Sequence, residues 1–200
     1  MTRCARKETV DFFETQYQGS PSWVINKVQP CVFEALELIQ SNGRALDVGC
    51  GVGEVVNYLA ERGFEAHGVD ISTTAIAQAK NDATVRNLTS VFHEQDAFSL
   101  EHMGLTFDLI VDVGLFHLMS DDERQDYSVQ LDKISSQNTL LLLMGFDVNQ
   151  RPNKPRGINP SVIEPYFKPG WDMKVIQEVQ YVAASKMDDV KGWLFQLQKN

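Results

Sequence analysis

Short apolar segments alternate with longer helix-like segments along this chain up to residue 146. The segments with the length and apolar character of strands are residues 44–50, 64–70, 91–97, 107–114 and 139–146. Helix-like segments begin near Gly53, Ser72 and Ser120. Strands that alternate with helices form a parallel sheet with helices packed on its faces. The pattern therefore predicts an α/β fold.

The last quarter of the sequence has a different composition and pattern. The segment DVNQRPNKPRGINP, which starts at residue 147, is rich in Pro, Asn and Gly and is expected to form a loop. Two alternating segments, residues 171–183 and 190–200, predict an antiparallel hairpin at the sheet edge. Earlier, SDDE at residues 120–123 has the spacing of a capping box. Its acidic residues are therefore expected to begin a solvated helix and not to act in catalysis.

Composition limits the class of protein. Two hundred residues with 43% hydrophobic content suit one domain, with residues 1–40 as a cap or lid segment and 41–200 as the core. The net charge of −9 opposes binding to nucleic acid or anionic lipid. Cys4, Cys31 and Cys50 share no spacing of a metal site or disulfide framework. With neither a signal peptide nor a membrane span in view, we expect a soluble cytoplasmic protein.

The turn LDVGCGVGEVV, residues 46–56, predicts a ligand site after the first strand. Glycines at such a turn let the backbone approach a ligand closely. A dinucleotide site would need Gly-x-Gly-x-x-Gly, but here the third glycine arrives early, at Gly53, and Glu54 stands where glycine is wanted. Asp70 ends the second strand, where a carboxylate can accept hydrogen bonds from both ribose hydroxyls of a nucleoside. The pattern favours an adenosine ligand that lacks phosphates.

These features resemble the class I S-adenosylmethionine (SAM) dependent methyltransferases over roughly residues 10 to 195. The acid-x-Gly-x-Gly-x-Gly turn corresponds to the first motif of that family, and GVDIS, HEQDAFSL and FDLIVDVGLFH resemble its second, third and fourth motifs. The resemblance implies a Rossmann-like fold with a mostly parallel seven-stranded sheet. It also implies SAM as methyl donor, S-adenosylhomocysteine as product, and no metal.

The resemblance also assigns residues to the donor site. Asp70 would hold the ribose, Ile71 would lie against the adenine face, and Asp96 would accept the adenine amine. The full set of expected cofactor-binding residues is Trp23, Asp47, Gly49, Gly51, Gly53, Asp70, Ile71, Asp96, Ala97 and Asp112.

Several of these residues have a second interpretation that the sequence leaves open. Asp47 could satisfy backbone N–H groups, and Asp70 could cap the helix near Ser72. Asp96 could be a surface acid, and Asp112 could cap a loop instead of facing the methionine ammonium group. Cys50, inside the turn, is expected to be a packing residue.

Within the family, the chain is most similar to small-molecule methyltransferases of the thiopurine, thiol, halide and tellurite type. SPSW at residues 20–23 resembles their N-terminal cap, and FDLIVDVGLFH resembles their fourth strand. The chain departs from that group before the fifth strand, where it has ISSQNTL and many members have Pro-Gly-Gly. This position is far from the donor methyl, so the departure does not bear on the chemistry.

The acceptor side is expected to involve Tyr17, Phe116, His117 and Arg156. His117 could orient the nucleophile or take its proton, or it could be a packed residue. Tyr17 and Trp23 resemble a lid that excludes water, while Arg156 could meet an acidic substrate or lie in solvent.

These observations predict methyl transfer from SAM to a small soft nucleophile by in-line displacement. Oxygen, nitrogen or carbon acceptors remain alternatives, as does a SAM-binding protein without transferase activity. A nicotinamide-dependent oxidoreductase is disfavoured by the glycine spacing and by Glu54. We expect a small-molecule partner, no nucleic acid or membrane partner, and a monomer or weak homodimer.

Overall fold

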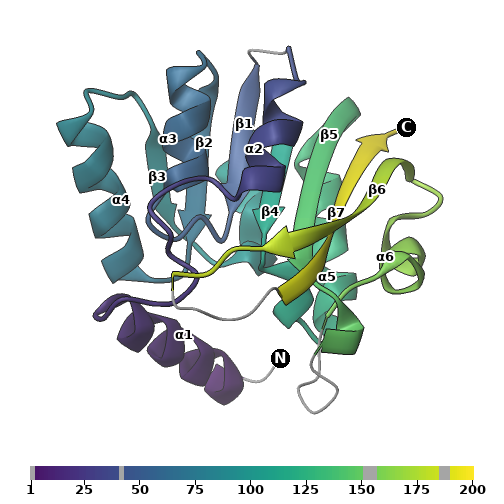
Figure 1. The fold of residues 1–200 in the computed structure, drawn as a ribbon, viewed down its shortest axis with the longest axis horizontal. Helices are drawn as coiled ribbons and strands as arrows, with labels where there is room; N and C mark the ends of the chain where they lie inside the picture. The colour runs from purple at the N-terminus through teal and green to yellow at the C-terminus, as the bar shows by residue number, and fades with distance from the viewer. Residues whose placement is uncertain (1–2, 41–42, 151–156, 185–189) are drawn as a thin grey trace.

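The computed structural model describes residues 3–40, 43–150, 157–184 and 190–200, and contains one seven-stranded sheet in the order β3-β2-β1-β4-β5-β7-β6 (Figure 1). The strands are β1 Arg44–Val48, β2 Glu65–Asp70, β3 Val91–Glu94, β4 Phe107–Val113, β5 Ser135–Phe146, β6 Trp171–Tyr181 and β7 Val190–Lys199. Strands β1 to β5 pair in parallel, while β7 runs antiparallel to both β5 and β6. The predicted Rossmann-like fold with its C-terminal hairpin is confirmed.

Helices cover both faces of the sheet and enclose two hydrophobic cores. One core lies under α2 Pro30–Glu37, α3 Glu54–Glu61 and α4 Thr73–Val85, in front of the sheet in Figure 1. The other packs α5 Asp121–Lys133, α6 Pro160–Phe167 and the 3-10 helix η1 Ala97–Met103 against the opposite face. A sheet buried on both faces is the arrangement expected of parallel strands.

The predicted helix starts are confirmed by their capping contacts. Gly53 is the N-cap of α3, and Ser72 caps α4 by accepting the Ala75 N–H at 3.1 Å. The capping box of α5 is present, since the Ser120 backbone N–H donates to Glu123 at 2.7 Å. The acids of this turn therefore begin a helix, as the sequence predicted.

The structure differs from the sequence-based prediction in several boundaries. β3 ends at Glu94, because Asp96 caps a 3-10 helix where strand was expected. β5 is longer than predicted, and helix α6 follows the Pro-rich loop, with Asn159 capping it by accepting the Val162 N–H at 2.9 Å. Helix α2 and the 3-10 helices η2 Phe116–Leu118 and η3 Val148–Gln150 were not predicted.

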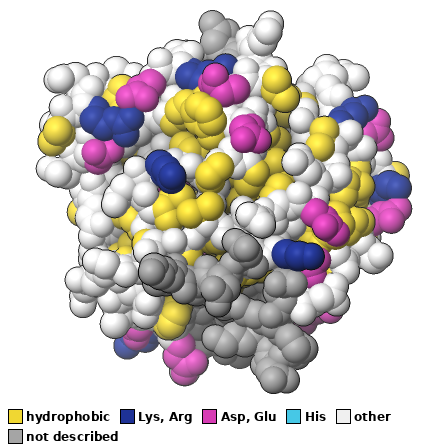
Figure 2. Space-filling view, in the orientation of Figure 1, with side chains coloured by type: hydrophobic (Ala, Val, Ile, Leu, Met, Phe, Trp, Pro, Cys, Tyr) yellow, Lys and Arg dark blue, Asp and Glu magenta, His cyan; other side chains and the backbone are white. Residues whose placement is uncertain are grey.

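The N-terminal helix α1 Arg3–Tyr17 lies across the end of the sheet at which the parallel strands stop (Figure 1). From there residues 22–29, which we name the strap, cross in front of the sheet toward α2. On this face hydrophobic side chains lie near the centre, with charged groups of both signs around them (Figure 2). None of the helices in the described ranges is both long and apolar enough to cross a membrane.

Candidate active site

The glycine turn between β1 and α3 is built to bring backbone close to other groups. Gly51 and Gly53 adopt φ of +52° and +86°, a region that side chains rarely occupy. A Cβ on Gly51 would lie 2.6 Å from the Tyr17 hydroxyl, and one on Gly53 would lie 2.8 Å from the Phe92 ring. Gly49, also at positive φ, donates its N–H to the Val69 carbonyl at 2.8 Å. The turn therefore has no room for side chains at these positions.

Asp70 links the ends of two strands. One carboxylate oxygen accepts the Gly51 N–H at 2.9 Å and the other accepts the Ser72 N–H at 2.9 Å. Burial raises the pKa of Asp70, and the N–H donors of Ser72 and Gly51 oppose that shift. Asp70 thus accepts the N–H of Ser72, the residue that caps α4, and is not itself the helix cap. Ribose binding stays a prediction, which the position of this buried carboxylate beside the glycine turn supports.

The other expected donor residues follow the neighbouring strand ends. Asp96 lies after β3 and accepts the Phe98 N–H at 2.9 Å, which places Ala97 at the start of η1. Ile71 is half-buried beside Asp70. Because β1, β2 and β3 are adjacent and parallel, these residues lie along one edge of the sheet. Their contacts with a nucleoside remain predictions.

Asp47 lies behind the turn, where it is 3% exposed and borders a cavity of about 60 Å³. Burial raises the pKa of Asp47 well above its ordinary value, and the nearby carboxyl groups of Asp112, Glu54 and Asp70 raise it further. Cys50 is buried in the first hydrophobic core, which confirms its expected packing role. Burial also raises the pKa of its thiol.

Tyr17 and Trp23 come together over the glycine turn. The Trp23 indole N–H donates to the Tyr17 hydroxyl at 3.1 Å, and the two rings meet edge to face at 6.0 Å. Both side chains line the cavity with Gly49, Gly51 and Asp47. Phe13 packs edge-on against Trp23, and Phe12, which is 54% exposed, packs edge-on against Phe13 at the outer side of this cluster. The two predicted lid residues are thus brought to the predicted donor site.

Helix α1 is anchored at the start of α4 by one carboxylate. Glu14 accepts the Ser72 hydroxyl at 2.7 Å and the Thr74 N–H at 3.2 Å, and it also contacts the Thr74 hydroxyl. Farther along α4, the Gln78 side chain donates to the Tyr17 carbonyl at 3.0 Å. A carboxylate is favoured at a helix N-terminus by the unpaired N–H groups there. These contacts fix the helix that ends in Tyr17.

Two residues at the end of β4 and just after it were predicted in the site, Asp112 with the donor and Phe116 with the acceptor. Asp112 is fully buried and accepts the N–H groups of Leu115 at 2.8 Å and Phe116 at 3.1 Å, so it caps the turn after β4. Burial raises the pKa of Asp112 to about 7. Phe116 is fully buried in the second core, against Tyr166 and Phe167. Its position favours a packing role over the predicted substrate contact.

His117 is 4% exposed and packs against Phe146, with ring centroids 4.5 Å apart. Phe146 in turn packs against Tyr181 at 4.5 Å, and Tyr181 reaches the cavity. The packed interpretation of His117 is therefore present, and its catalytic role stays a prediction. Arg156 lies outside the described residues.

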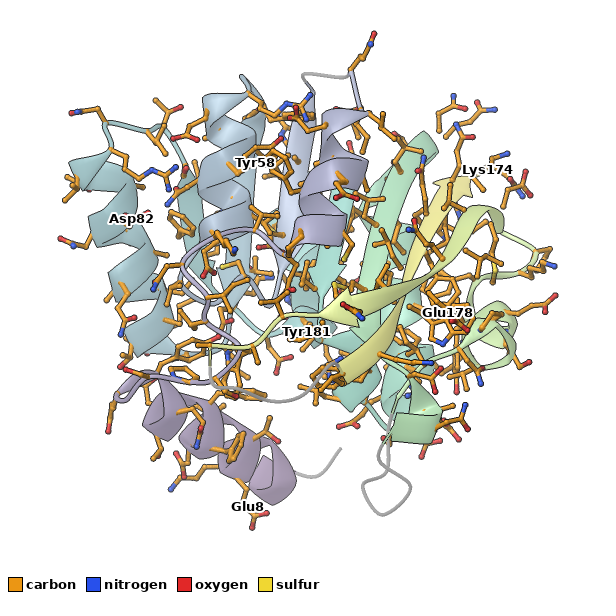
Figure 3. All side chains as sticks on the ribbon, viewed as in Figure 1. Glu8, Tyr58, Asp82, Lys174, Glu178 and Tyr181 are labelled. Carbon is orange, nitrogen blue, oxygen red and sulfur yellow. The ribbon has the colours of Figure 1, made fainter. Side chains whose placement is uncertain are left out.

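Tyr181 and Gln29 are cavity residues that the sequence did not reveal. Tyr181 is the last residue of β6 and lies close to the strap (Figure 3), where burial raises the pKa of its hydroxyl to about 12. Gln29, 5% exposed, ends the strap and lines the same cavity. The alternation of β6 predicted which of its residues share a face, but no local signal shows which strand end meets the glycine turn.

Comparison with known proteins agrees with this geometry. A family model described as "Methyltransferase domain" matches residues 45–134. The chain is also 34% identical over 167 residues to the 2-heptyl-1-hydroxyquinolin-4(1H)-one methyltransferase of Mycobacteroides abscessus, a match that spans 79% of this chain and 73% of that protein. This chain therefore belongs to the class I SAM-dependent methyltransferases.

Three further proteins are similar to this chain. The probable thiol methyltransferase 2 of Arabidopsis thaliana is 29% identical over 140 residues, which are 68% of this chain and 62% of that protein. A solved structure described as "Conversion of a Disulfide Bond into a Thioacetal Group during Echinomycin Biosynthesis" has a TM-score of 0.82 and 27% identity, covering 96% of this chain and 93% of its own. TehB from Haemophilus influenzae, at 16% identity and TM-score 0.69 over 96% of this chain and 67% of its own, shares the fold.

Proposed function

We propose that this chain transfers the SAM methyl group to a small molecule whose nucleophilic atom is already deprotonated near neutral pH. A thiolate, or a halide or tellurite-type anion, is the first candidate. The observation that carries this proposal is the lining of the cavity beyond the glycine turn. Among the described residues, the lining outside Tyr17, the strap and residues 47–55 consists of Val113 and Tyr181, and the Tyr181 hydroxyl, with a pKa of about 12, stays protonated.

An acceptor that needs no base suits such a site. Bound SAM supplies a methyl group on a sulfonium, and displacement in line leaves S-adenosylhomocysteine. A thiol is partly ionised near pH 7 and strongly nucleophilic, so alignment and exclusion of water are what the protein must supply. His117, buried against Phe146, is better placed to support the wall of the site than to take a proton.

The donor side fits SAM by its chemistry. The turn at Gly51 and Gly53 leaves backbone bare of Cβ atoms, and Asp70 and Asp96 follow adjacent strands. In the proposed roles Asp70 accepts the ribose hydroxyls, Asp96 accepts the adenine amine, and Tyr17 with Trp23 excludes water. Asp112 is held by the turn amides, whereas Asp47 borders the cavity and is better placed to meet the methionine part of the donor.

The similar proteins support sulfur as the acceptor atom. One is named a thiol methyltransferase, and another structure is described by the conversion of a disulfide bond into a thioacetal. Both descriptions concern reactions at sulfur. They support the proposal, although acceptors vary within one fold.

A hydroxyl on a flat heterocycle is the second candidate. It is favoured by the 34% identity to a methyltransferase named for a hydroxyquinolinone. The wall formed by His117, Phe146 and Tyr181 is aromatic and would suit a planar ring. An acidic hydroxyl would also need no base, so both candidates agree on a deprotonated nucleophile.

The test is methyl transfer from labelled SAM to matched acceptors that differ in one atom or in acidity. Thiophenol with phenol, 4-nitrophenol with phenol, and a 1-hydroxyquinolin-4-one with its 1-hydrogen analogue form such pairs, with iodide and tellurite added. We expect turnover of thiophenol, and of hydroxyl acceptors only where these are acidic. Turnover of phenol equal to that of thiophenol would refute the proposal. SAM binding without any turnover would instead indicate a SAM-binding protein that lacks transferase activity.

A further inference from the structure

Gln29 makes a partly buried two-point contact between distant parts of the chain. Its side-chain N–H donates to the Val182 carbonyl at 2.8 Å, and its side-chain oxygen accepts the Val182 N–H at 3.1 Å. A second contact, from the Ala184 N–H to the Ser22 carbonyl at 2.7 Å, joins the other end of the strap to the same segment. The strap and the end of β6 are therefore bound together in front of the cavity.

One side of this contact rests on a rigid base. Gln29 is the N-cap residue of α2, and Pro30 fixes the first helical position after it. Val32 and Leu36 of that helix are completely buried. At the other end of α2, Arg62 donates to the Ile39 carbonyl at 2.8 Å. Because α2 is held along its length, the Gln29 amide presents a fixed pair of hydrogen-bonding atoms to β6.

The other side of the contact sets a cavity residue. Val182 directly follows Tyr181, so its backbone position determines where the Tyr181 ring stands. The Tyr181 ring packs on Phe146, and its hydroxyl lies 3.6 Å from the Cβ that Gly114 would carry. Gly114 ends the β4 region, where the family's fourth motif lies. Gln29 is thus connected through Val182 to the acceptor side of the site.

The same contact bears on how the donor enters. Val24, Ile25 and Val28 of the strap line the cavity together with the glycine turn. That cavity, about 60 Å³, has space for only a few water molecules. A molecule the size of SAM therefore needs this lining to open, and the strap supplies a large part of it.

We propose that Gln29 is a positioning residue: its amide ties the strap to the end of β6, which keeps the donor enclosed and places Tyr181 at the acceptor. The role rests on the proposed methyl transfer. Gln29 lies where the strap meets α2, outside all of the family motifs. It predicts that loss of the amide speeds SAM release and weakens acceptor binding together.

The test compares Gln29→Met, which keeps the shape and removes both hydrogen bonds, with Gln29→Glu, which keeps the oxygen that accepts the Val182 N–H. Gln40→Ala, at an exposed position just after α2, is the control. SAM release is measured by stopped-flow displacement with S-adenosylhomocysteine. Acceptor KM is measured with thiophenol or, if another panel member is turned over better, with that acceptor. Melting curves confirm that every variant is folded.

We expect roughly tenfold faster SAM release and a roughly tenfold higher acceptor KM in Gln29→Met, about the effect of one or two hydrogen bonds. Gln29→Glu should fall between this variant and the wild type, and Gln40→Ala should match the wild type. Unchanged release and KM in a folded Gln29→Met overturn the role of Gln29 while leaving methyl transfer standing. If the wild type turns over no acceptor, the proposed function fails, and equal SAM release in all variants then overturns the enclosure of the donor as well.

Discussion

The Tyr17 hydroxyl lies directly over the α-carbon of Gly51, so close that a Cβ at Gly51 would stand 2.6 Å from it. Tyr17 comes from the N-terminal helix and Gly51 from the first turn of the sheet. The glycine turn and the end of helix α1 are therefore in close contact at this point. A methyl group at Gly51 would separate them.

Gly51→Ala tests this fit. The alanine would have to adopt φ near +52° and displace Tyr17, so we expect SAM affinity to fall by about tenfold or more, together with a loss of stability of about 1 to 2 kcal/mol. Gly104→Ala is the matched control, because Gly104 has φ of +64° and open space around its Cβ position. Calorimetric SAM titrations and melting curves of both variants are compared. An equal loss of affinity in the two would contradict the fit.

Replacing Glu14 should weaken the attachment of helix α1 to α4 without changing the glycine turn. Glu14→Ala removes the carboxylate that accepts the Ser72 hydroxyl and the Thr74 N–H. We expect SAM to bind several-fold more weakly, because closing α1 would then cost more free energy. Glu8→Ala on the same helix is the control, since Glu8 is exposed and points away from the sheet (Figure 3). Equal affinity in both variants, measured by fluorescence titration, would rule out this anchor.

Asp70→Asn should separate ribose binding from the hydrogen bonds that Asp70 accepts from the Gly51 and Ser72 backbone. The variant keeps one side-chain oxygen for a backbone N–H but loses the charge, so we expect at least roughly tenfold weaker SAM binding, about the value of one charge-assisted hydrogen bond. Asp108→Asn is the control, because Asp108 also accepts a backbone N–H, from Arg44 at 2.8 Å, but lies at the beginning of β4. If calorimetry gives unchanged SAM affinity for Asp70→Asn, the role of Asp70 is limited to accepting the Gly51 and Ser72 N–H groups.

Asp112 should give the protein a measurable dependence of stability on pH. The folded-state pKa of about 7 lies above the ordinary value of 3.8, so the folded state retains a proton that the unfolded chain releases between these values. The contribution of Asp112 is therefore fully favourable below about pH 4. It falls as pH rises through 7, by up to about 1.4 kcal/mol per pH unit.

Asp112→Asn removes that decline. Its side-chain oxygen can still accept the Leu115 N–H, and no buried charge forms at any pH. Urea unfolding of the wild type and the variant at pH 4.5, 6 and 7.5 should show the variant gaining stability relative to the wild type as pH rises. Asp172→Asn, at an exposed position of β6, should stay parallel to the wild type. A constant difference between Asp112→Asn and the wild type would show that Asp112 does not titrate in this range.

The clustering of the expected donor residues could be predicted from sequence because these residues follow strand ends. Parallel strands that are adjacent in the sheet stop at one edge, so Gly51, Asp70 and Asp96 had to come near one another once their strands were recognised. The same reasoning identified α3, α4 and α5 from their caps. Local patterns were sufficient where the fold itself brings consecutive segments together.

The acceptor side could not be predicted in this way. Phe116 follows β4, which carries the fourth family motif. Its ring lies in the core, where it packs against Tyr166 and Phe167. Tyr181 and Gln29 reach the cavity from segments 152 residues apart (181 − 29), through contacts with Val182 that no local pattern encodes. The start of α6, by contrast, has a local signal, because Asn159 is an N-cap residue and Pro160 follows it. Both residues were predicted from the sequence to lie in a loop.

In the proposed roles, different parts of the chain hold the two reactants. Apart from Asp112 in β4, the residues expected to bind the donor lie between Trp23 and Ala97, whereas the aromatic wall of His117, Phe146 and Tyr181 follows β4 in the sequence. Mutations in the second half can therefore alter which molecule is accepted while the machinery for SAM is inherited intact. Acceptor preference can therefore evolve through single substitutions that leave SAM binding unchanged.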